Sequence, residues 1–200
     1  MNTAQVLVEL LKEYRVEHIF GVPGDTTMPL YDALYAARGE ITHIMARDER
    51  SAAFMADAYA RLAHKPGITE APSGGGATYV IPGVAEANGS SVPMVVFTSD
   101  VPITDEGKGT LTAIDQQRLL QAATKWSAVV KRPQMLPDIV RSAKVPPKKN
   151  RRPLVNATCG PRATRTPCAM LGWLSEAGPC REPGRASPES ASRPRPSAPR

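Results

Sequence analysis

The chain has 200 residues, which is enough for one ordinary domain with a substantial hydrophobic core. Its formal net charge of +6 would suggest a nucleic-acid or membrane partner if the charge were evenly spread. It is not, because residues 146–200 hold 11 Lys and Arg against 3 Asp and Glu, whereas residues 1–145 hold 14 against 16. The basic excess therefore characterises the C-terminal segment alone.

The N-terminus, MNTAQVLVELLKEY, lacks the basic region and the uninterrupted apolar core of a signal peptide. No run approaches the about 20 apolar residues that cross a bilayer. The three cysteines, Cys159, Cys168 and Cys180, fit neither a zinc site nor an even disulfide framework, and His18, His43 and His64 show no metal spacing. We therefore expect a cytoplasmic protein with no membrane partner and no metal ligands of its own.

The first elements are a helix, a strand and a second helix. Apolar residues recur at helical spacing over residues 4–14, which predicts an amphipathic helix. The short apolar run 18–22 predicts a strand, and Pro23-Gly24-Asp25 marks the turn after it. Thr26 or Thr27 is expected to cap the helix that follows.

The next strands enclose the most informative turns. The apolar run 41–45 predicts a buried strand, and the Ala-rich segment after it predicts a helix, which places Glu49 at the strand-to-helix turn. Residues 68–71 predict a weaker strand that contains Glu70, where an unpaired charge is costly. A Gly-rich loop then leads into a helix that contains Pro82, at a typical cost of about 3 kcal/mol.

The run 92–98 is β-branched and uninterrupted, and is the clearest buried strand in the chain. After a loop at 108–112, the pattern predicts a helix at 115–123, a strand at 126–130 and a closing helix at 133–143. Because strands alternate with helices, we predict an α/β fold with a doubly wound, flavodoxin-like parallel sheet covering residues 1–145.

From Pro146 onward neither a helical nor a strand period is sustained, and 11 of the 20 prolines lie there. This composition buries too little apolar surface to offset about 1–2 kcal/mol of backbone entropy per residue. We predict that residues 146–200 form a disordered Pro- and Arg-rich tail. A reading-frame shift in GC-rich coding DNA is our hypothesis for the abrupt change.

Three motifs occur in order: GVPGD at 21–25, RDERSAAFMADAYARLAHKPG at 47–67 and APSGGGAT at 71–78. Together they resemble the N-terminal pyrimidine-binding domain of thiamine-diphosphate-dependent enzymes of the acetolactate-synthase type. The later stretches GVAEANGSSVPMVVFTSD and GKGTLTAIDQQ continue the resemblance, which covers residues 1–143. It implies thiamine diphosphate as cofactor and, in full-length relatives, decarboxylation of a 2-keto acid with transfer of the carbanion to an acceptor.

The resemblance makes Glu49 the catalytic carboxyl, which hydrogen-bonds a ring nitrogen of the aminopyrimidine. Such a carboxyl must exchange a proton near neutral pH, and burial beside Phe54 and Met55 would favour its protonated form. The alternative is a solvated acid in the first helical turn, stabilised by about 0.3–1 kcal/mol by the helix dipole. Asp48 stands where the family commonly has His, and it either caps the helix or favours the protonated form of Glu49.

The other candidate contacts come from loops. The Gly-rich loop matches neither a dinucleotide-binding nor a Walker pattern, and in the family it lets the backbone approach the pyrimidine or substrate pocket. The alternative for this loop is a flexible turn without ligand contact. The expected cofactor-binding residues are Glu49, Gly24, Gly74, Gly76 and Ala77, and the weaker substrate candidates are Pro23, Lys108 and Gln116. Lys108 and Gln116 are expected to be solvated, and Leu111-Thr112 replaces the Phe-Gln pair of true acetolactate synthases.

The metal-site signature of the family's second cofactor domain, Gly-Asp-Gly followed by Asn, occurs nowhere in the sequence. We therefore expect half of a cofactor site, with magnesium reached only through a missing or partner domain, and no activity from the chain alone. The expected partners are a second copy in a homodimer or a complementary diphosphate-binding domain, with a small 2-keto acid as substrate. The alternatives are a non-enzymatic association domain or an aberrant frameshifted product. Nucleic-acid binding through the tail would rest on charge alone.

Overall fold

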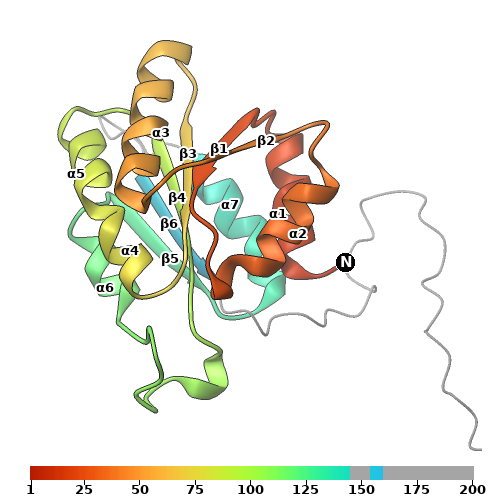
Figure 1. Ribbon diagram of the computed structural model, residues 1–200, viewed down its shortest axis with the longest axis vertical. Helices are drawn as coiled ribbons and strands as arrows, with labels where there is room; N and C mark the ends of the chain where they lie inside the picture. Colours follow the sequence, from red (N-terminus) through yellow and green to blue (C-terminus); the bar gives the residue numbers. More distant parts are fainter. Residues whose placement is uncertain (145–153, 160–200) are drawn as a thin grey trace, which may run out of the picture. The chain divides into compact units, whose positions relative to one another are not determined.

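A six-stranded parallel sheet with the order β2-β1-β3-β4-β6-β5 organises the computed structural model (Figure 1), which describes residues 1–144 and 154–159. The strands are β1 (His18–Gly21), β2 (Thr42–Met45), β3 (Gly67–Ala71), β4 (Met94–Ser99), β5 (Trp126–Val130) and β6 (Leu154–Cys159). The predicted α/β class and parallel sheet are confirmed.

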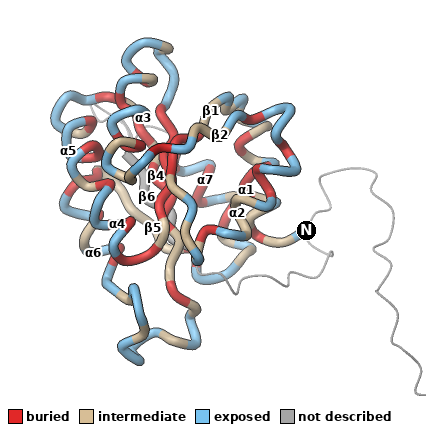
Figure 2. Tube along the Cα trace, in the orientation of Figure 1, coloured by how far each residue is buried: buried red, intermediate tan, exposed pale blue. Residues whose placement is uncertain are grey.

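Helices cover both faces of the sheet, as a doubly wound fold requires (Figure 1). The apolar cluster on one face draws on α1 (Thr3–Glu13), α2 (Met28–Ala36) and α7 (Leu136–Lys144). The cluster on the other face draws on α3 (Glu49–Ala63), α5 (Ile81–Gly89) and α6 (Gln116–Gln121), with the short α4 (Gly75–Tyr79) before α5. Figure 2 shows buried positions along the strands and exposed positions on the outer sides of the helices.

Small residues bring α3 close to its neighbours. Its buried face consists of alanines and Asp57: Ala52, Ala53, Ala56 and Ala60 are each at most 2% exposed. A Cβ added at Gly83 of α5 would lie 2.6 Å from the Ala53 Cβ and 2.9 Å from the backbone nitrogen of Phe54. The two helices therefore pack almost backbone to backbone, which fixes the position of Glu49 at the start of α3.

The direction of the connections reverses between β1 and β3. From β1 the chain crosses to β2 on one side, whereas from β3 it crosses to β4 on the other side. In open α/β sheets, ligands bind outside the carboxyl ends of the strands at such a switch point. The GVPGD loop follows β1, the turn with Glu49 follows β2 and the Gly-rich loop follows β3. We call this side of the molecule the carboxyl edge.

The sequence analysis assigned no strand after residue 145, and β6 corrects this for residues 154–159. β6 lies between β4 and β5, with Met94 to Ser99 paired in register with Leu154 to Cys159. The run LVNATC is short and mixes polar with apolar residues, so its strand character depends on neighbours distant in sequence. The rest of the predicted disordered tail, 146–153 and 160–200, lies outside the described residues.

The expected cost of Pro82 does not arise. The chain forms two helices there, α4 and α5, and Pro82 lies in the first turn of α5. Backbone N–H groups in a first turn have no partner within the helix, so the missing N–H of proline removes no hydrogen bond.

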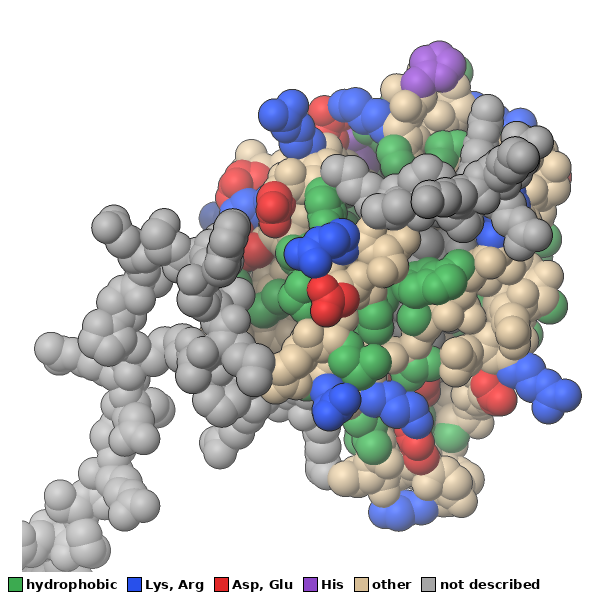
Figure 3. All heavy atoms as spheres, turned by 180° about the vertical axis from the view of Figure 1, so that it is seen from behind, with side chains coloured by type: hydrophobic (Ala, Val, Ile, Leu, Met, Phe, Trp, Pro, Cys, Tyr) green, Lys and Arg blue, Asp and Glu red, His purple; other side chains and the backbone are tan. Residues whose placement is uncertain are grey.

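Charged side chains on the rear of the molecule are of both signs. Figure 3 shows Lys and Arg interspersed with Asp and Glu around apolar groups. Among the described residues, ion pairs join Lys12 Nζ to Glu40 Oε1 at 2.7 Å and Lys65 Nζ to Glu17 Oε1 at 2.6 Å. Among the helices of the described part, none is long and apolar enough to cross a membrane.

Gly83→Ala should lower the free energy of unfolding by about 1–3 kcal/mol, the usual cost of overpacking, because the new methyl group would push α5 away from α3. Gly89→Ala in the same helix is the matched control, since a Cβ there meets nothing within 4 Å. Urea unfolding of both variants measures the difference. Equal effects of the two substitutions would contradict the close packing of α3 on α5.

Candidate functional site

Glu49 is the first residue of α3, at the carboxyl edge, and it is half-buried. Asp48 caps the helix before it: its Oδ1 accepts from the Ser51 backbone N–H at 2.9 Å and its Oδ2 accepts from the Ser51 hydroxyl at 2.8 Å. These hydrogen bonds hold the pKa of Asp48 below its ordinary value, and the bond from the Ser51 backbone N–H has the larger effect. Of the two roles considered for Asp48, the geometry shows the capping role.

The three sequence motifs meet around Pro72. A Cβ at Gly24 would lie 2.5 Å from the Pro72 Cβ, and a Cβ at Gly76 would lie 2.6 Å from the Pro72 Cγ. The same added atom at Gly76 would lie 3.1 Å from Glu49 Oε1. Glycine is therefore required at both positions, and the bare backbone of Gly76 lies directly against the Glu49 carboxyl. The structure brings together Glu49, Gly24 and Gly76 as the sequence predicted.

Hydrogen bonds between side chains tie the loops of this edge together. The hydroxyl of Thr26 lies 2.6 Å from the Ser99 hydroxyl and accepts from the Ser73 backbone N–H at 3.0 Å. The Ser73 hydroxyl in turn lies 2.7 Å from that of Thr112. Sequence reasoning assigned no site role to these residues. The available signal was a hydroxyl residue at or soon after the end of each of the strands β1, β3 and β4.

Gln116 is 1% exposed, so the expectation that it is solvated was wrong. Its Nε2 donates to the Ser99 backbone oxygen at 2.9 Å, which ties the start of α6 to the end of β4. Lys108 is exposed, as expected, and pairs with Asp105 at 3.6 Å. Pro23 is also exposed.

Gly74 and Ala77 hold the Gly-rich loop in shape. Gly74 has a φ of +67°, and a Cβ there would lie 2.7 Å from the Thr112 Cα. Both the positive φ and the lack of room for a Cβ require glycine at this position. Ala77 is fully buried in α4, so its side chain packs inside the protein.

Phe54 and Met55 are only partly buried. Each is 42% exposed, because both project from the outer side of α3. Other large apolar side chains are exposed on elements that reach the carboxyl edge, including Met45 at 67% and Tyr79 at 62%. The burial of Glu49 beside Phe54 and Met55 stays a prediction.

A second carboxyl, that of Glu70, lies inside the sheet. Glu70 is 1% exposed, and its Oε1 accepts a hydrogen bond from the Tyr31 hydroxyl. His43 Nε2 lies 2.9 Å from the Tyr31 oxygen and 3.8 Å from Glu70 Oε1. A Cβ at Gly21 of β1 would overlap Glu70 Oε1, so this glycine makes room for the carboxyl. We call Tyr31, His43 and Glu70 the buried cluster.

Burial raises the pKa of Glu70 above its ordinary value, although the hydrogen bonds of Glu70 with His43 and Tyr31 act in the opposite direction. Burial also raises the pKa of Tyr31, with the charges of Glu70 and Glu49 contributing. The second oxygen of Glu70, Oε2, is buried and has no hydrogen-bond partner among the described residues. Sequence reasoning noted Glu70 only as a costly charge. The pattern of a carboxyl in a buried strand was the available signal.

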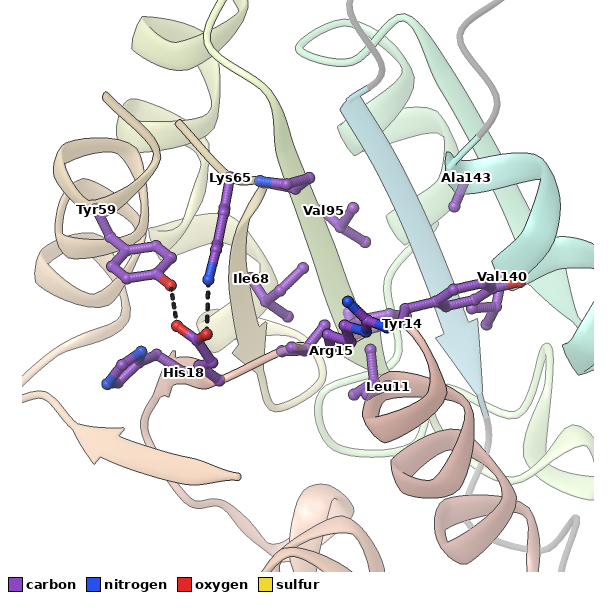
Figure 4. A pocket seen from close by; sticks show the side chains of 14 residues that line it. Leu11, Tyr14, Arg15, His18, Tyr59, Lys65, Ile68, Val95, Val140 and Ala143 are labelled. Atoms are coloured by element: carbon purple, nitrogen blue, oxygen red, sulfur yellow. Dashed lines mark hydrogen bonds and ion pairs between the residues drawn. The ribbon is translucent and has the colours of Figure 1, made fainter. Parts of the chain in front are cut away.

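A cavity of about 440 Å³ lies at the opposite edge of the sheet, where the strands begin (Figure 4). Apolar side chains such as Leu11, Ile68 and Val95 line it. At its rim, Glu17 accepts from Lys65 at 2.6 Å and from Tyr59 at 3.3 Å. None of the residues that the sequence predicts for the site lines this cavity.

Comparison with known proteins gives a consistent result. The family model described as "Thiamine pyrophosphate enzyme, N-terminal TPP binding domain" matches residues 1–119. An acetolactate synthase from Arthrospira platensis is 40% identical over 142 residues, 70% of this chain and 24% of that protein. The acetolactate synthase isozyme 2 large subunit of Escherichia coli is 40% identical over 143 residues, 72% of this chain and 26% of that protein.

A third relative is named as a decarboxylase and not as an acetolactate synthase. The probable 2-ketoarginine decarboxylase AruI of Pseudomonas aeruginosa is 37% identical over 146 residues, 72% of this chain and 26% of that protein. The chain thus spans about a quarter of the length of the curated relatives it matches.

Replacing Glu70 by Gln should change how stability depends on pH. Because folding raises the pKa of Glu70, its contribution is fully present below the unfolded pKa of about 4.3 and is lost as pH rises through the folded value. Gln cannot ionise, so its contribution to the free energy of unfolding does not change with pH. Relative to the native chain, Glu70→Gln should therefore gain about 1–3 kcal/mol between acidic and alkaline pH, comparable with the desolvation cost of one buried polar group.

Urea unfolding across this pH range measures the difference. Glu13→Gln, at an exposed position of α1, is the control, and its difference from the native chain should stay flat. A Glu70→Gln difference that is independent of pH would show that burial does not shift the proton equilibrium of Glu70.

Proposed function

The chain belongs to the thiamine pyrophosphate enzymes through their N-terminal TPP binding domain, and from this premise we propose that its carboxyl edge holds the aminopyrimidine half of thiamine diphosphate. The observation that carries the proposal is the convergence of three loops at the switch point. There the Glu49 carboxyl lies against the bare backbone of Gly76, with Gly24 and Gly76 both packed on Pro72.

These residues suit the cofactor. A flat heteroaromatic ring needs a hydrogen-bonding carboxyl next to backbone that can be approached closely, and Glu49 with Gly76 supplies both. Asp48 fixes the first turn of α3 and so fixes the direction from which Glu49 approaches. In this role Glu49 exchanges a proton with a ring nitrogen, and Gly24, Gly74 and Ala77 shape the surrounding loops. When bound, the cofactor supplies a nucleophilic carbon that adds to a carbonyl and accepts the electrons released by decarboxylation.

We propose a 2-keto acid as the substrate class of the assembled enzyme, with decarboxylation and transfer of the carbanion to an acceptor as the reaction. Relatives named as acetolactate synthases and one named as a probable decarboxylase match to similar extents, which supports the class without choosing among its members. Of the two residues that replace the Phe-Gln pair of true acetolactate synthases, Leu111 is 90% exposed. The Thr112 hydroxyl is hydrogen-bonded to the Ser73 hydroxyl at the carboxyl edge. Pro23 and Lys108 remain weaker candidates for substrate contact.

A complementary diphosphate-binding domain is the partner that we propose, in a cytoplasmic assembly formed either with such a domain or as a homodimer. The exposed apolar side chains at the carboxyl edge support this proposal, because such a surface gains stability when a partner covers it. They include Met28, Met45 and Tyr79. Magnesium would be bound by the partner domain, and the chain alone would be inactive.

Gly76→Ala should weaken thiamine diphosphate binding at least tenfold, about 1.4 kcal/mol, because its methyl group would collide with Pro72 and crowd the Glu49 carboxyl. Gly75→Ala is the matched control, since a Cβ at this neighbouring residue meets nothing within 4 Å. Isothermal titration of the cofactor into each variant, together with a complementary domain, compares the two affinities. Equal affinities would exclude the Gly-rich loop from the site.

Glu49→Gln should reduce turnover by at least 100-fold in the assembled enzyme, the usual size of a general acid–base contribution, while the thermal unfolding midpoint stays close to that of the native chain. The physical reason is that an amide keeps the shape of the carboxyl but cannot exchange a proton. Steady-state decarboxylation of a 2-keto acid and a thermal melt are the two measurements. Retained turnover would remove the proposed role of Glu49.

A further inference from the structure

The cavity at the edge where the strands begin has apolar walls (Figure 4). Its lining includes Leu11 of α1, Ile68 of β3, Val95 of β4 and Val140 of α7. Its volume of about 440 Å³ lies within the range of about 300–1,000 Å³ that is usual for small-molecule pockets. Because transfer of apolar surface from water to such walls is favourable, the cavity suits the hydrocarbon body of a small ligand.

Arg15 brings a positive charge to this cavity. It follows the C-terminal end of α1, is exposed to solvent and belongs to the lining. Figure 4 shows its side chain between Leu11 on one side and Ile68 and Val95 on the other. Within the described part of the chain, its guanidinium group has no hydrogen-bond or ion-pair partner. The guanidinium of Arg15 is therefore available to an anion that enters the cavity.

The backbone of Arg15 has a conformation that favours glycine. Its φ is +56°, in the left-handed region. Its N–H donates to the Lys12 oxygen at 2.8 Å, and the N–H of Val16 donates to the Leu11 oxygen at 3.0 Å. These are the bonds of a helix end at which glycine is the usual left-handed residue. Arginine is unfavourable there, and an outlier of this kind points to a function of the side chain.

The other charged side chains of the lining pair with each other. Lys65 Nζ donates to Glu17 Oε1 at 2.6 Å, and the Tyr59 hydroxyl donates to Glu17 Oε2 at 3.3 Å (Figure 4). The charged lining thus consists of two cations, Arg15 and Lys65, and one anion, Glu17, which gives a net charge of +1 with His18 neutral. The cavity therefore favours a ligand with a single negative charge.

We propose that this cavity binds an aliphatic monocarboxylate, with its chain between the apolar walls and its carboxylate on the Arg15 guanidinium. The forked N–H groups of arginine match the two oxygens of a carboxylate. One net positive charge balances a carboxylate, whereas a phosphate group would bring about 1.5–2 negative charges. The site is separate from the proposed cofactor site, because no residue expected to hold thiamine diphosphate lines the cavity.

Isothermal titration of the full chain with octanoate, butyrate and octanol tests the proposal. Octanoate should bind at least tenfold more tightly than butyrate, because each buried methylene adds about fourfold to the affinity. Octanol has the same chain length without a charge, so it measures the apolar contribution alone. Equal affinities for octanoate and butyrate would overturn the proposal, since the chain would then lie outside the cavity.

Arg15→Gln separates the contribution of the charge from that of the walls. It should weaken octanoate binding at least tenfold and leave octanol binding unchanged, because it removes a charged hydrogen-bond donor and no part of the apolar walls. Arg15→Lys keeps the positive charge and should retain more octanoate affinity than Arg15→Gln. Arg118→Gln is the matched control, since Arg118 is exposed on α6, lies outside the cavity lining and should affect neither ligand.

Arg15 is exposed, so these variants should keep the fold, which a thermal melt of each checks. Octanoate affinity that is unchanged in Arg15→Gln would overturn the proposal. An equal loss of octanoate and octanol affinity would overturn it too, because Arg15 would then shape the cavity without binding the carboxylate.

Methyl NMR of the full chain shows where octanoate lies. The proposal predicts perturbed methyl groups on the walls, at Leu11, Ile68, Val95 and Val140. Perturbations confined to Met28 and Met45 would indicate adsorption to exposed apolar side chains and would contradict the proposal. The result does not depend on whether the carboxyl edge binds thiamine diphosphate.

Discussion

The close approach of backbone segments at the carboxyl edge of β1 and β3 is the constraint on which the site depends. Pro72 lies between two glycines, and a side chain on either would collide with its ring. Because the loops after β1 and β3 meet there, and Glu49 from the turn after β2 lies against one of them, three strand ends form one surface. The hydroxyl network through Thr26, Ser73 and Ser99 then fixes the loops relative to β4.

Much of the fold followed from the sequence because its elements have strong local patterns. Strand β5 was predicted with its observed bounds, and the positions of α1 and β4 agreed within two residues. What the sequence did not show depends on tertiary contacts. β6 is a strand because β4 and β5 pair with it on its two sides. Gln116 is buried where its side chain donates a hydrogen bond to the backbone oxygen of Ser99. These partners are distant in the sequence from the residues that they contact.

The site was predicted unevenly for a similar reason. Glu49, Gly24 and Gly76 stood out through motifs whose spacing is local, and the structure places them together. The buried cluster did not, because Tyr31, His43 and Glu70 come from three elements that only the sheet brings together. Glu70 was noticed as a violation of the rule that buried strands are apolar. The hydrogen bond that it accepts from Tyr31 reduces that cost, whereas its second oxygen, Oε2, has no hydrogen-bond partner among the described residues.

Amide chemical-shift mapping of the ¹⁵N-labelled full chain with thiamine diphosphate and Mg²⁺ tests the central claim most directly, because it reports where the ligand binds without requiring turnover. The account predicts that the perturbed amides cluster at the carboxyl edge, in residues 21–25, 49–51 and 73–77. Perturbations centred instead on Arg15 and Lys65, at the cavity on the opposite edge, would contradict it. So would the absence of any perturbation at saturating ligand.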